Sequence, residues 1–243
     1  MRASLFQRSS VLSSFSLCAL WLAFSFCAEA QTAAPSAHVL AQKVDAHYNH
    51  LASLEARYSE HYTGMGLDRT ETGTLLLKKP GRMRWSYDQP TGKVFILDGK
   101  FAWFYTPGDA QAQKIPAKQL DDLRSPLRFL LGHTQLEKEL TGLAVSVNSK
   151  TNTGILSGEA AHNDGGVNYQ LSGVPHGMEQ RIRSLTLTVL GDGTILGMRL
   201  EEIDGSVTEF TFTGMKENIP VKDADFVFTP PDGVEVVNGL PPI

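Results

Sequence analysis

The spacing of apolar residues changes along the chain, from a helical period to a period of two. Leu40, Val44, His47 and Leu51 recur at intervals of four, three and four, which places their side chains on one helical face. This pattern predicts one amphipathic helix over Ala37–Leu54. From there on, short alternating runs separated by turn residues predict β-strands.

These runs predict an antiparallel meander in two sets. The first set is Arg57–Thr63, Thr72–Lys79, Arg82–Tyr87, Lys93–Leu97 and Phe101–Tyr105. The second set is Leu143–Val147, Gly154–Ser157, Val167–Leu171, Ile182–Leu190, Ile195–Glu202, Val207–Met215 and Phe226–Thr229. About eleven or twelve strands in one domain are enough to curl a sheet toward closure. The predicted class is therefore mainly β (α+β), an incomplete antiparallel β-barrel of about eleven strands.

A segment of different character separates the two sets. Ser125-Pro126 begins it and Gly132 ends it, with apolar residues between, and Gln135–Leu140 follows. Serine with proline favours a helix start and glycine a helix stop. Short helices here need a surface to cover, and we expect them to form a lid over the concave face of the sheet.

The first thirty residues have the layout of a secretory signal. Arg2 and Arg8 precede an apolar stretch over Val11–Phe26, and Ala28-Glu29-Ala30 supplies a small-residue cleavage pattern. We expect cleavage after Ala30, which leaves a single domain over residues 31–243 in the periplasm. No later segment is long and apolar enough to cross a bilayer.

The composition excludes several kinds of site and partner for the mature chain. Both cysteines, Cys18 and Cys27, fall within the predicted signal, so disulfides, zinc-thiolate sites and cysteine nucleophiles are excluded. Neither follows a small residue, which argues against a lipid anchor on this chain. The net charge of −4 gives no general attraction to nucleic acid.

The sequence contains only weak candidates for catalytic or metal-binding residues. His47 and His50, with His61 nearby, are the best metal candidates, yet no acidic residue or third histidine follows at metalloprotease spacing. Ser157 and His162 belong to a glycine-rich loop that nothing orders. We therefore expect a protein that is not an enzyme, with no catalytic residues, no metal and no cofactor.

The strands of the first set are rich in large aromatic side chains. Met83, Trp85 and Tyr87 form one face of their strand, and Phe101, Trp103 and Tyr105 form one face of theirs. These rings could fill a barrel core or line a hollow interior, because periodicity does not separate the two cases.

Several segments together resemble the outer-membrane lipoprotein carrier family, the LolA-like proteins. They are Leu77–Trp85, Gln89-Pro90, Asp98-Gly99, Trp103–Tyr105, Gly191–Ile195 and Phe226–Val236, and they span nearly the whole mature chain in order. The resemblance implies a half-barrel lidded by short helices, whose apolar interior receives the acyl chains of lipoproteins. It also implies as partners acylated lipoproteins, an inner-membrane lipoprotein-releasing ABC transporter and an outer-membrane lipoprotein receptor. We expect this chain to be a monomer that binds no nucleic acid.

The resemblance also suggests which residues line such a cavity. The expected lining residues are Leu75, Leu77, Met83, Trp85, Phe95, Leu97 and Trp103, with Phe129 and Leu130 from the lid. Many family members carry an arginine before the proline of this motif, where it holds the lid, and this chain has Lys79 there. A lysine lacks the planar fork of a guanidinium, so Lys79 is either a weaker lid latch or part of a solvated strand edge.

Two other functions are compatible with the same sequence. A periplasmic sensor or assembly factor would use the fold to recognise a protein or glycolipid without shuttling it. A secreted hydrolase would need a nucleophile and a base brought together from distant positions.

Overall fold

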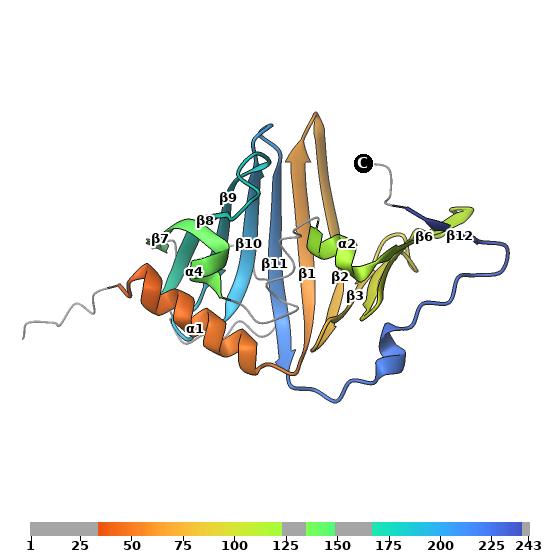
Figure 1. Ribbon diagram of the computed structural model, residues 1–243, viewed down its shortest axis with the longest axis horizontal. Helices are drawn as coiled ribbons and strands as arrows, with labels where there is room; N and C mark the ends of the chain where they lie inside the picture. Colours follow the sequence, from red (N-terminus) through yellow and green to blue (C-terminus); the bar gives the residue numbers. More distant parts are fainter. Residues whose placement is uncertain (1–33, 123–134, 149–166, 240–243) are drawn as a thin grey trace, which may run out of the picture. The chain divides into compact units, whose positions relative to one another are not determined.

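The computed structural model describes residues 34–122, 135–148 and 167–239 (Figure 1). They belong to one compact unit that begins at Ala34. The predicted signal, the predicted strand Gly154–Ser157, and the lid segment with Phe129 and Leu130 lie outside the described residues.

The described part of the chain contains one long helix, a few short ones and many strands. The helices are α1 (Ala37–His50), α2 (Ala117–Asp122), α4 (Leu136–Glu139) and the 3-10 helix η1 (Asp223–Phe226). The strands before α4 are β1 (Ser53–Gly64), β2 (Leu67–Lys78), β3 (Arg82–Tyr87), β4 (Val94–Asp98), β5 (Phe101–Tyr105) and β6 (Gln111–Pro116). The later strands are β7 (Leu140–Asn148), β8 (Asn168–Pro175), β9 (Ile182–Val189), β10 (Ile195–Glu202), β11 (Val207–Glu217) and β12 (Glu235–Asn238).

Within the described residues, all twelve strands form a single open sheet. Their order is β12-β6-β5-β4-β3-β2-β1-β11-β10-β9-β8-β7, so β12 and β7 are the edges. Every pair is antiparallel except β12 with β6, which is parallel. The predicted mainly β class with an incomplete barrel is therefore confirmed, with an open sheet and no closed barrel.

Three elements were missed or wrongly assigned from the sequence pattern. The sequence pattern missed β6 and β12, which are short and lack a strong alternation. The segment Phe226–Thr229, predicted as a strand, begins with the last residue of η1 and continues without pairing in the sheet. Elsewhere β3, β5 and β10 have the predicted bounds.

Helix α1 ends four residues before the predicted boundary at Leu54. The Ser36 side chain accepts a hydrogen bond from the Val39 amide at its start, a common N-cap. At Leu51 the backbone becomes extended, and the chain enters β1 two residues later. Leu51 and Leu54 are buried as predicted, but Leu51 is the C-cap residue of α1 and Leu54 belongs to β1. No helix in the described ranges is long and apolar enough to span a membrane.

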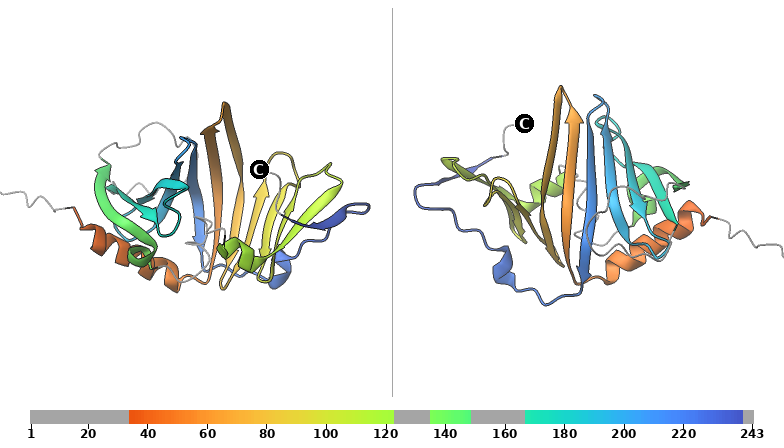
Figure 2. Two further views of the ribbon diagram at one scale, coloured as in Figure 1. Left: turned by 45° about the horizontal axis from the view of Figure 1, so that its top comes forward. Right: turned by 180° about the vertical axis from the view of Figure 1, so that it is seen from behind.

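The sheet has two differently covered faces, which Figure 2 shows from two sides. On one face, α1 with Leu40 and Val44, α4 with Leu136, and α2 with Ala117 pack into the main hydrophobic cluster. We call this the helix face. On the other face η1 lies against β3 and β4, and Phe226 packs with Val94 and Ile96. We call this the η1 face.

Candidate functional site

On the helix face of β1–β6, the strand register aligns side chains in rows that cross the sheet. The leucine row is buried throughout and consists of Leu54, Leu77, Met83, Leu97, Ala102 and Ile115. The tryptophan row, two residues further along each strand, consists of Ala56, Leu75, Trp85, Phe95, Phe104 and Gln113. Because neighbours in a row are directly opposite each other, each row forms a continuous surface.

The rows become polar further along the strands. The tyrosine row contains Tyr58, Gly73 and Tyr87, and the glutamate row beyond it pairs Glu60 with Glu71. The Tyr58 ring makes edge contacts with the rings of Trp85 and Tyr87, at centroid distances of 4.4 Å and 5.8 Å. Aromatic pairs in this geometry add stability beyond the area they bury.

Six of the seven described lining candidates face the same side of the sheet and are buried or partly buried there. They are Leu75, Leu77, Met83, Trp85, Phe95 and Leu97. Leu75 and Met83 have no exposed surface, so a ligand reaches them only when the groups that cover this face separate. Their contact with a ligand stays a prediction.

Trp103 is on the η1 face, so its assignment to the same lining is wrong. It pairs with Ile96, whereas Leu97 pairs with Ala102, and side chains alternate between the two faces. The Trp103 indole donates a hydrogen bond to Asp98 at 3.0 Å, and its ring packs on Phe228. The helix-face ring of β5 is Phe104, whose centroid is 4.7 Å from that of Phe95.

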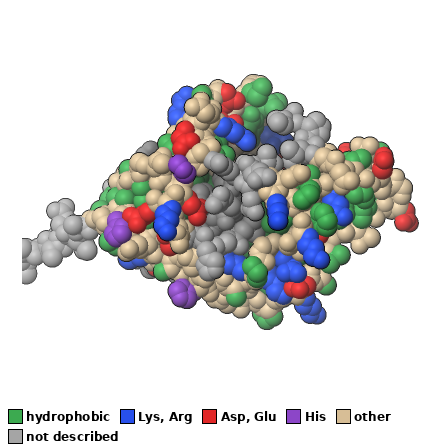
Figure 3. All heavy atoms as spheres, in the orientation of Figure 1, with side chains coloured by type: hydrophobic (Ala, Val, Ile, Leu, Met, Phe, Trp, Pro, Cys, Tyr) green, Lys and Arg blue, Asp and Glu red, His purple; other side chains and the backbone are tan. Residues whose placement is uncertain are grey.

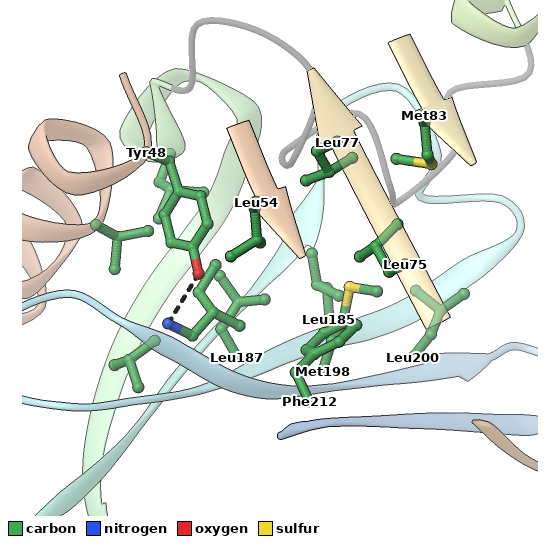
Figure 4. Close-up of a cluster of buried hydrophobic side chains, with 14 of the residues drawn as sticks. Tyr48, Leu54, Leu75, Leu77, Met83, Leu185, Leu187, Met198, Leu200 and Phe212 are labelled. Carbon is green, nitrogen blue, oxygen red and sulfur yellow. Dashed lines mark hydrogen bonds between the residues drawn. The ribbon is translucent and has the colours of Figure 1, made fainter. Parts of the chain in front are cut away.

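The helix face continues across β8–β11 with apolar side chains. Figure 4 shows Leu185, Leu187, Met198, Leu200 and Phe212 pointing toward the side chains of β1–β3. All five are buried. The two halves of the sheet therefore share one hydrophobic cluster, although the strand residues predicted to line a cavity all lie in the first half.

Tyr48 anchors α1 to this cluster. Its side chain is 2% exposed, and its hydroxyl accepts a hydrogen bond from the Ile195 amide at 3.1 Å. Burial raises the pKa of Tyr48 far above its ordinary value, so the hydroxyl stays neutral. The helix also approaches the turn before β10, where a Cβ on Gly193 would be 2.5 Å from the Lys43 backbone.

Lys79, the candidate lid latch, is bound to α1. Its ammonium group donates a hydrogen bond to the Tyr48 carbonyl in the last turn of the helix, where cations are favourable. Burial lowers the pKa of Lys79. It follows an interior strand, β2, and its amide bonds the Ala52 carbonyl, so the solvated-edge interpretation is wrong.

The glutamate row forms a partly buried charged cluster. The Lys93 ammonium lies 2.5 Å from a Glu71 carboxylate oxygen and 4.2 Å from the centre of the Tyr87 ring. Arg69 is 3.8 Å from the other oxygen of Glu71. Burial, and then the charge of Glu71, raise the pKa of Glu60.

Two polar side-chain atoms on the helix face lack a hydrogen-bond partner. Among the described residues that are not exposed, they are the Tyr58 hydroxyl and the Gln113 side-chain oxygen. Tyr58 is 2% exposed, and burial raises the pKa of its hydroxyl far above the ordinary value. An unsatisfied buried hydroxyl is unfavourable and rare in folded proteins.

The η1 face carries ion pairs and basic side chains beside its small apolar cluster. Asp223 of η1 pairs with Lys78 at 2.6 Å and with Arg82 at 3.3 Å. Arg82, Lys100 and Lys114 line a surface pocket of about 450 Å³ together with Trp103 and Phe226. Arg84 donates to the Asp225 carbonyl. These groups attach the C-terminal segment to the sheet.

The three histidines considered as metal ligands have separate partners. His47 bonds Glu217 at 2.7 Å, His50 bonds the Ala46 carbonyl, and His61 bonds Asp68. In the part of the chain that the structure describes, no three histidine, acidic or cysteine residues are placed to hold a metal ion. Figure 3 shows histidine side chains on the side of α1 and α4, and lysines and arginines mainly over the half with α2.

The architecture is one open sheet whose buried apolar face is covered by helices. The sequence model described as "Outer membrane lipoprotein carrier protein LolA" matches residues 50–168. An outer-membrane lipoprotein carrier protein of Nitrosomonas europaea is 26% identical over 171 residues, 70% of this chain and 73% of that protein. One of Sodalis glossinidius is 28% identical over 204 residues, 83% of this chain and 89% of that protein.

A solved structure shows the same fold. An uncharacterized conserved protein from Thermus thermophilus matches with a TM-score of 0.50 and 15% identity, over 84% of this chain and 99% of that one. The sequence matches support a LolA-like family for this chain.

Proposed function

We propose that this chain is a periplasmic carrier that binds the acyl chains of lipoproteins released from the inner membrane and delivers them to the outer membrane. The observation that carries the proposal is the apolar surface of the helix face, where the leucine row crosses six neighbouring strands and the tryptophan row is apolar over five of them. The match to the outer membrane lipoprotein carrier protein model supports the same assignment. Binding involves no covalent change.

The energetics suit such a carrier. Removing acyl chain from water is worth about 0.8 kcal/mol per CH₂, so a chain of about sixteen carbons gains on the order of 10 kcal/mol. The helix face offers Leu75, Leu77, Met83, Trp85, Phe95 and Leu97 for this burial. The elements that cover them must separate for loading and for release.

The proposal includes a place in the cell and a set of partners. Residues 1–30 are a signal cleaved after Ala30, and residues 31–243 act in the periplasm as a monomeric single domain. An inner-membrane ABC transporter that releases lipoproteins loads the carrier, and an outer-membrane receptor unloads it. Lys79 holds α1 at the edge of the apolar face and contributes to its opening.

Native mass spectrometry of the secreted full chain tests the proposal. We expect a one-to-one complex with a co-expressed acylated lipoprotein, and no complex when a Cys→Ser change in that lipoprotein prevents acylation. A complex that forms without acyl groups, or no complex with either form, overturns the carrier proposal and favours a sensor or assembly factor.

Two neighbouring residues of β5 provide a matched pair of variants. Phe104→Asp places a charge on the helix face, whereas Tyr105→Asp places the same charge on the η1 face. We expect the complex to be lost with the first variant and kept with the second, in proteins whose thermal unfolding shows that both are folded. Equal binding by the two variants contradicts the location of the site.

A further inference from the structure

The helix face is polarised along its strands, from hydrocarbon to charge. The leucine row presents apolar side chains only, and the glutamate row, six residues away on β1, presents Glu60, Glu71 and the Lys93 ammonium. At about 3.4 Å per residue, these rows are roughly 20 Å apart. A ligand that covers this face has to be apolar at one end and polar at the other.

Tyr58 stands where the character of the face changes. Its ring lies over Gly73, where an added Cβ would be 2.7 Å from the Tyr58 hydroxyl oxygen. On one side is the Trp85 ring, and on the other is Glu60, two residues along the strand. The side chain is fully buried, and none of the described groups accepts or donates a hydrogen bond at its hydroxyl.

Gln113 supplies a second unsatisfied polar atom in the neighbouring tryptophan row. Its side-chain oxygen is buried without a partner within the described residues. Acyl chains cannot satisfy either group, because hydrocarbon neither donates nor accepts hydrogen bonds. The ester or amide carbonyl that joins an acyl chain to its headgroup can accept from the Tyr58 hydroxyl, whereas the Gln113 oxygen is itself an acceptor and needs a donor.

We propose that the Tyr58 hydroxyl donates a hydrogen bond to the carbonyl oxygen of the ester or amide linkage of the bound acyl chain. The chain then lies along the tryptophan and leucine rows, and the headgroup lies toward Glu60, Glu71 and Lys93. This inference rests on the proposed carrier function and assigns the orientation of its cargo. It defines the ligand as a carbonyl-linked lipid and not as hydrocarbon in general.

Two matched ligands distinguish the contribution of the Tyr58 hydrogen bond to binding from that of acyl-chain burial. The probes are a synthetic diacylglyceryl lipopeptide with ester linkages and its dialkyl ether analogue, which keeps the hydrocarbon but lacks the carbonyls. We expect the wild-type full chain to bind the ester about fivefold more tightly than the ether, the value of one ordinary hydrogen bond. In Tyr58→Phe this preference disappears, while binding of the ether is unchanged.

Tyr105→Phe is the matched control, because it removes the same atom from the opposite face of the sheet. It should keep the full preference for the ester. Tyr58→Phe keeps the ring that packs on Trp85, and its thermal stability should equal or exceed that of the wild type, since a buried unpaired hydroxyl is removed.

The outcomes distinguish this inference from the carrier function itself. If Tyr58→Phe still prefers the ester, or if the wild type binds ester and ether equally, the Tyr58 contact is overturned and the carrier function stands. If the wild type binds neither probe, the carrier function fails. A photoreactive group at the last carbon of the acyl chain should cross-link to the leucine row; cross-linking to Glu60 or Glu71 instead overturns the orientation.

Discussion

Trp85 and Trp103 lie on β3 and β5 of the same sheet, yet they have opposite surroundings. Trp85 is 2% exposed on the helix face, where it contacts the rings of Tyr58 and Phe210. Trp103 is partly exposed on the η1 face, where Asp98 accepts its indole N–H. The same side chain thus packs in a continuous apolar surface on one face and beside charges on the other.

The difference between the faces shows what each is suited to bind. In the leucine row of the helix face, apolar side chains follow one another across six neighbouring strands without interruption. On the η1 face a small cluster around Phe226 is flanked by the ion pairs of Asp223 with Lys78 and Arg82. A continuous apolar surface suits hydrocarbon, whereas scattered ion pairs and one buried ring fix a single peptide segment in place.

The largest expected contrast is between the two tryptophans. Trp85→Ala should lower the free energy of unfolding by about 4–5 kcal/mol, because it leaves a cavity among buried rings. Trp103→Ala should cost roughly 2 kcal/mol, because part of that ring is already in water. Urea unfolding measures both, and an equal loss from the two variants would remove the distinction between the faces.

Phe226 should account for most of the packing on the η1 face. Its side chain has no exposed surface, whereas that of the neighbouring Val227 is 60% exposed. We expect Phe226→Ala to cost about 3 kcal/mol and to make the segment between β11 and β12 susceptible to limited proteolysis. Val227→Ala, the control, should change neither property. Unchanged proteolysis in Phe226→Ala would mean that the ion pairs of Asp223 are sufficient to hold the segment.

Asp98 should make the η1 face sensitive to acid. Burial opposes ionisation of its carboxyl, but the N–H groups of Phe101, Trp103 and Lys100 outweigh it and keep the pKa of Asp98 below its usual value. A lowered pKa stabilises the fold above about pH 4, and that stability is lost as the pH falls through the folded pKa. Asp98→Asn should cost about 1–2 kcal/mol at neutral pH.

The pH dependence provides the check on Asp98. The difference in unfolding free energy between the wild type and Asp98→Asn should shrink as the pH falls below about 4, because the carboxyl of the unfolded wild type is protonated first and that of the folded wild type at lower pH. A difference that stays constant down to about pH 2 would show that packing, and not charge, makes Asp98 important.

The smallest expected effect is that of an exposed ion pair on β1. Arg57 and then Thr72 donate to Asp88 and lower its pKa, at distances of 2.5 Å and 2.7 Å. Because these groups are largely solvated, Asp88→Asn should cost less than about 1 kcal/mol, and the loss should decrease in high salt. A loss similar to that of Phe226→Ala would mean that charges contribute as much to this side of the sheet as packing does.

The repeating pattern of the sequence predicted most of the fold. Period-two runs with clear turns predicted the bounds of β3, β5 and β10, and the helical spacing predicted the position of α1. Propensity did not predict β6 and β12, because Gln111–Pro116 is short and ends in proline, and β12 is held by a parallel partner distant in the chain. Helix α1 was predicted too long, because Leu51 and Leu54 continue its apolar spacing after the backbone has become extended.

The candidate site was predicted only as far as the face of each strand was clear. Four of the five residues of β5 are aromatic, so alternation does not show which side of that strand is buried. The turn at Asp98-Gly99 determines the face of each β5 side chain, because it sets Leu97 opposite Ala102. Phe104, and not Trp103, is therefore opposite Phe95. Tyr58 and Gln113 were not predicted, since an unsatisfied hydrogen bond has no signature in sequence.

The central place of β1 also determines the order in which the sheet can be completed. Among the described strands, every other antiparallel pair joins strands with consecutive numbers, whereas β1 pairs with β11, from Thr63 with Val207 to Leu54 with Glu217. Two locally folded meanders, β1–β6 and β7–β11, are thus joined by one pairing of high contact order, which we expect to form last and slowly. A chain that emerges amino terminus first therefore keeps one edge of β1 unpaired until Glu217 has appeared, and during that time it depends on protection from aggregation.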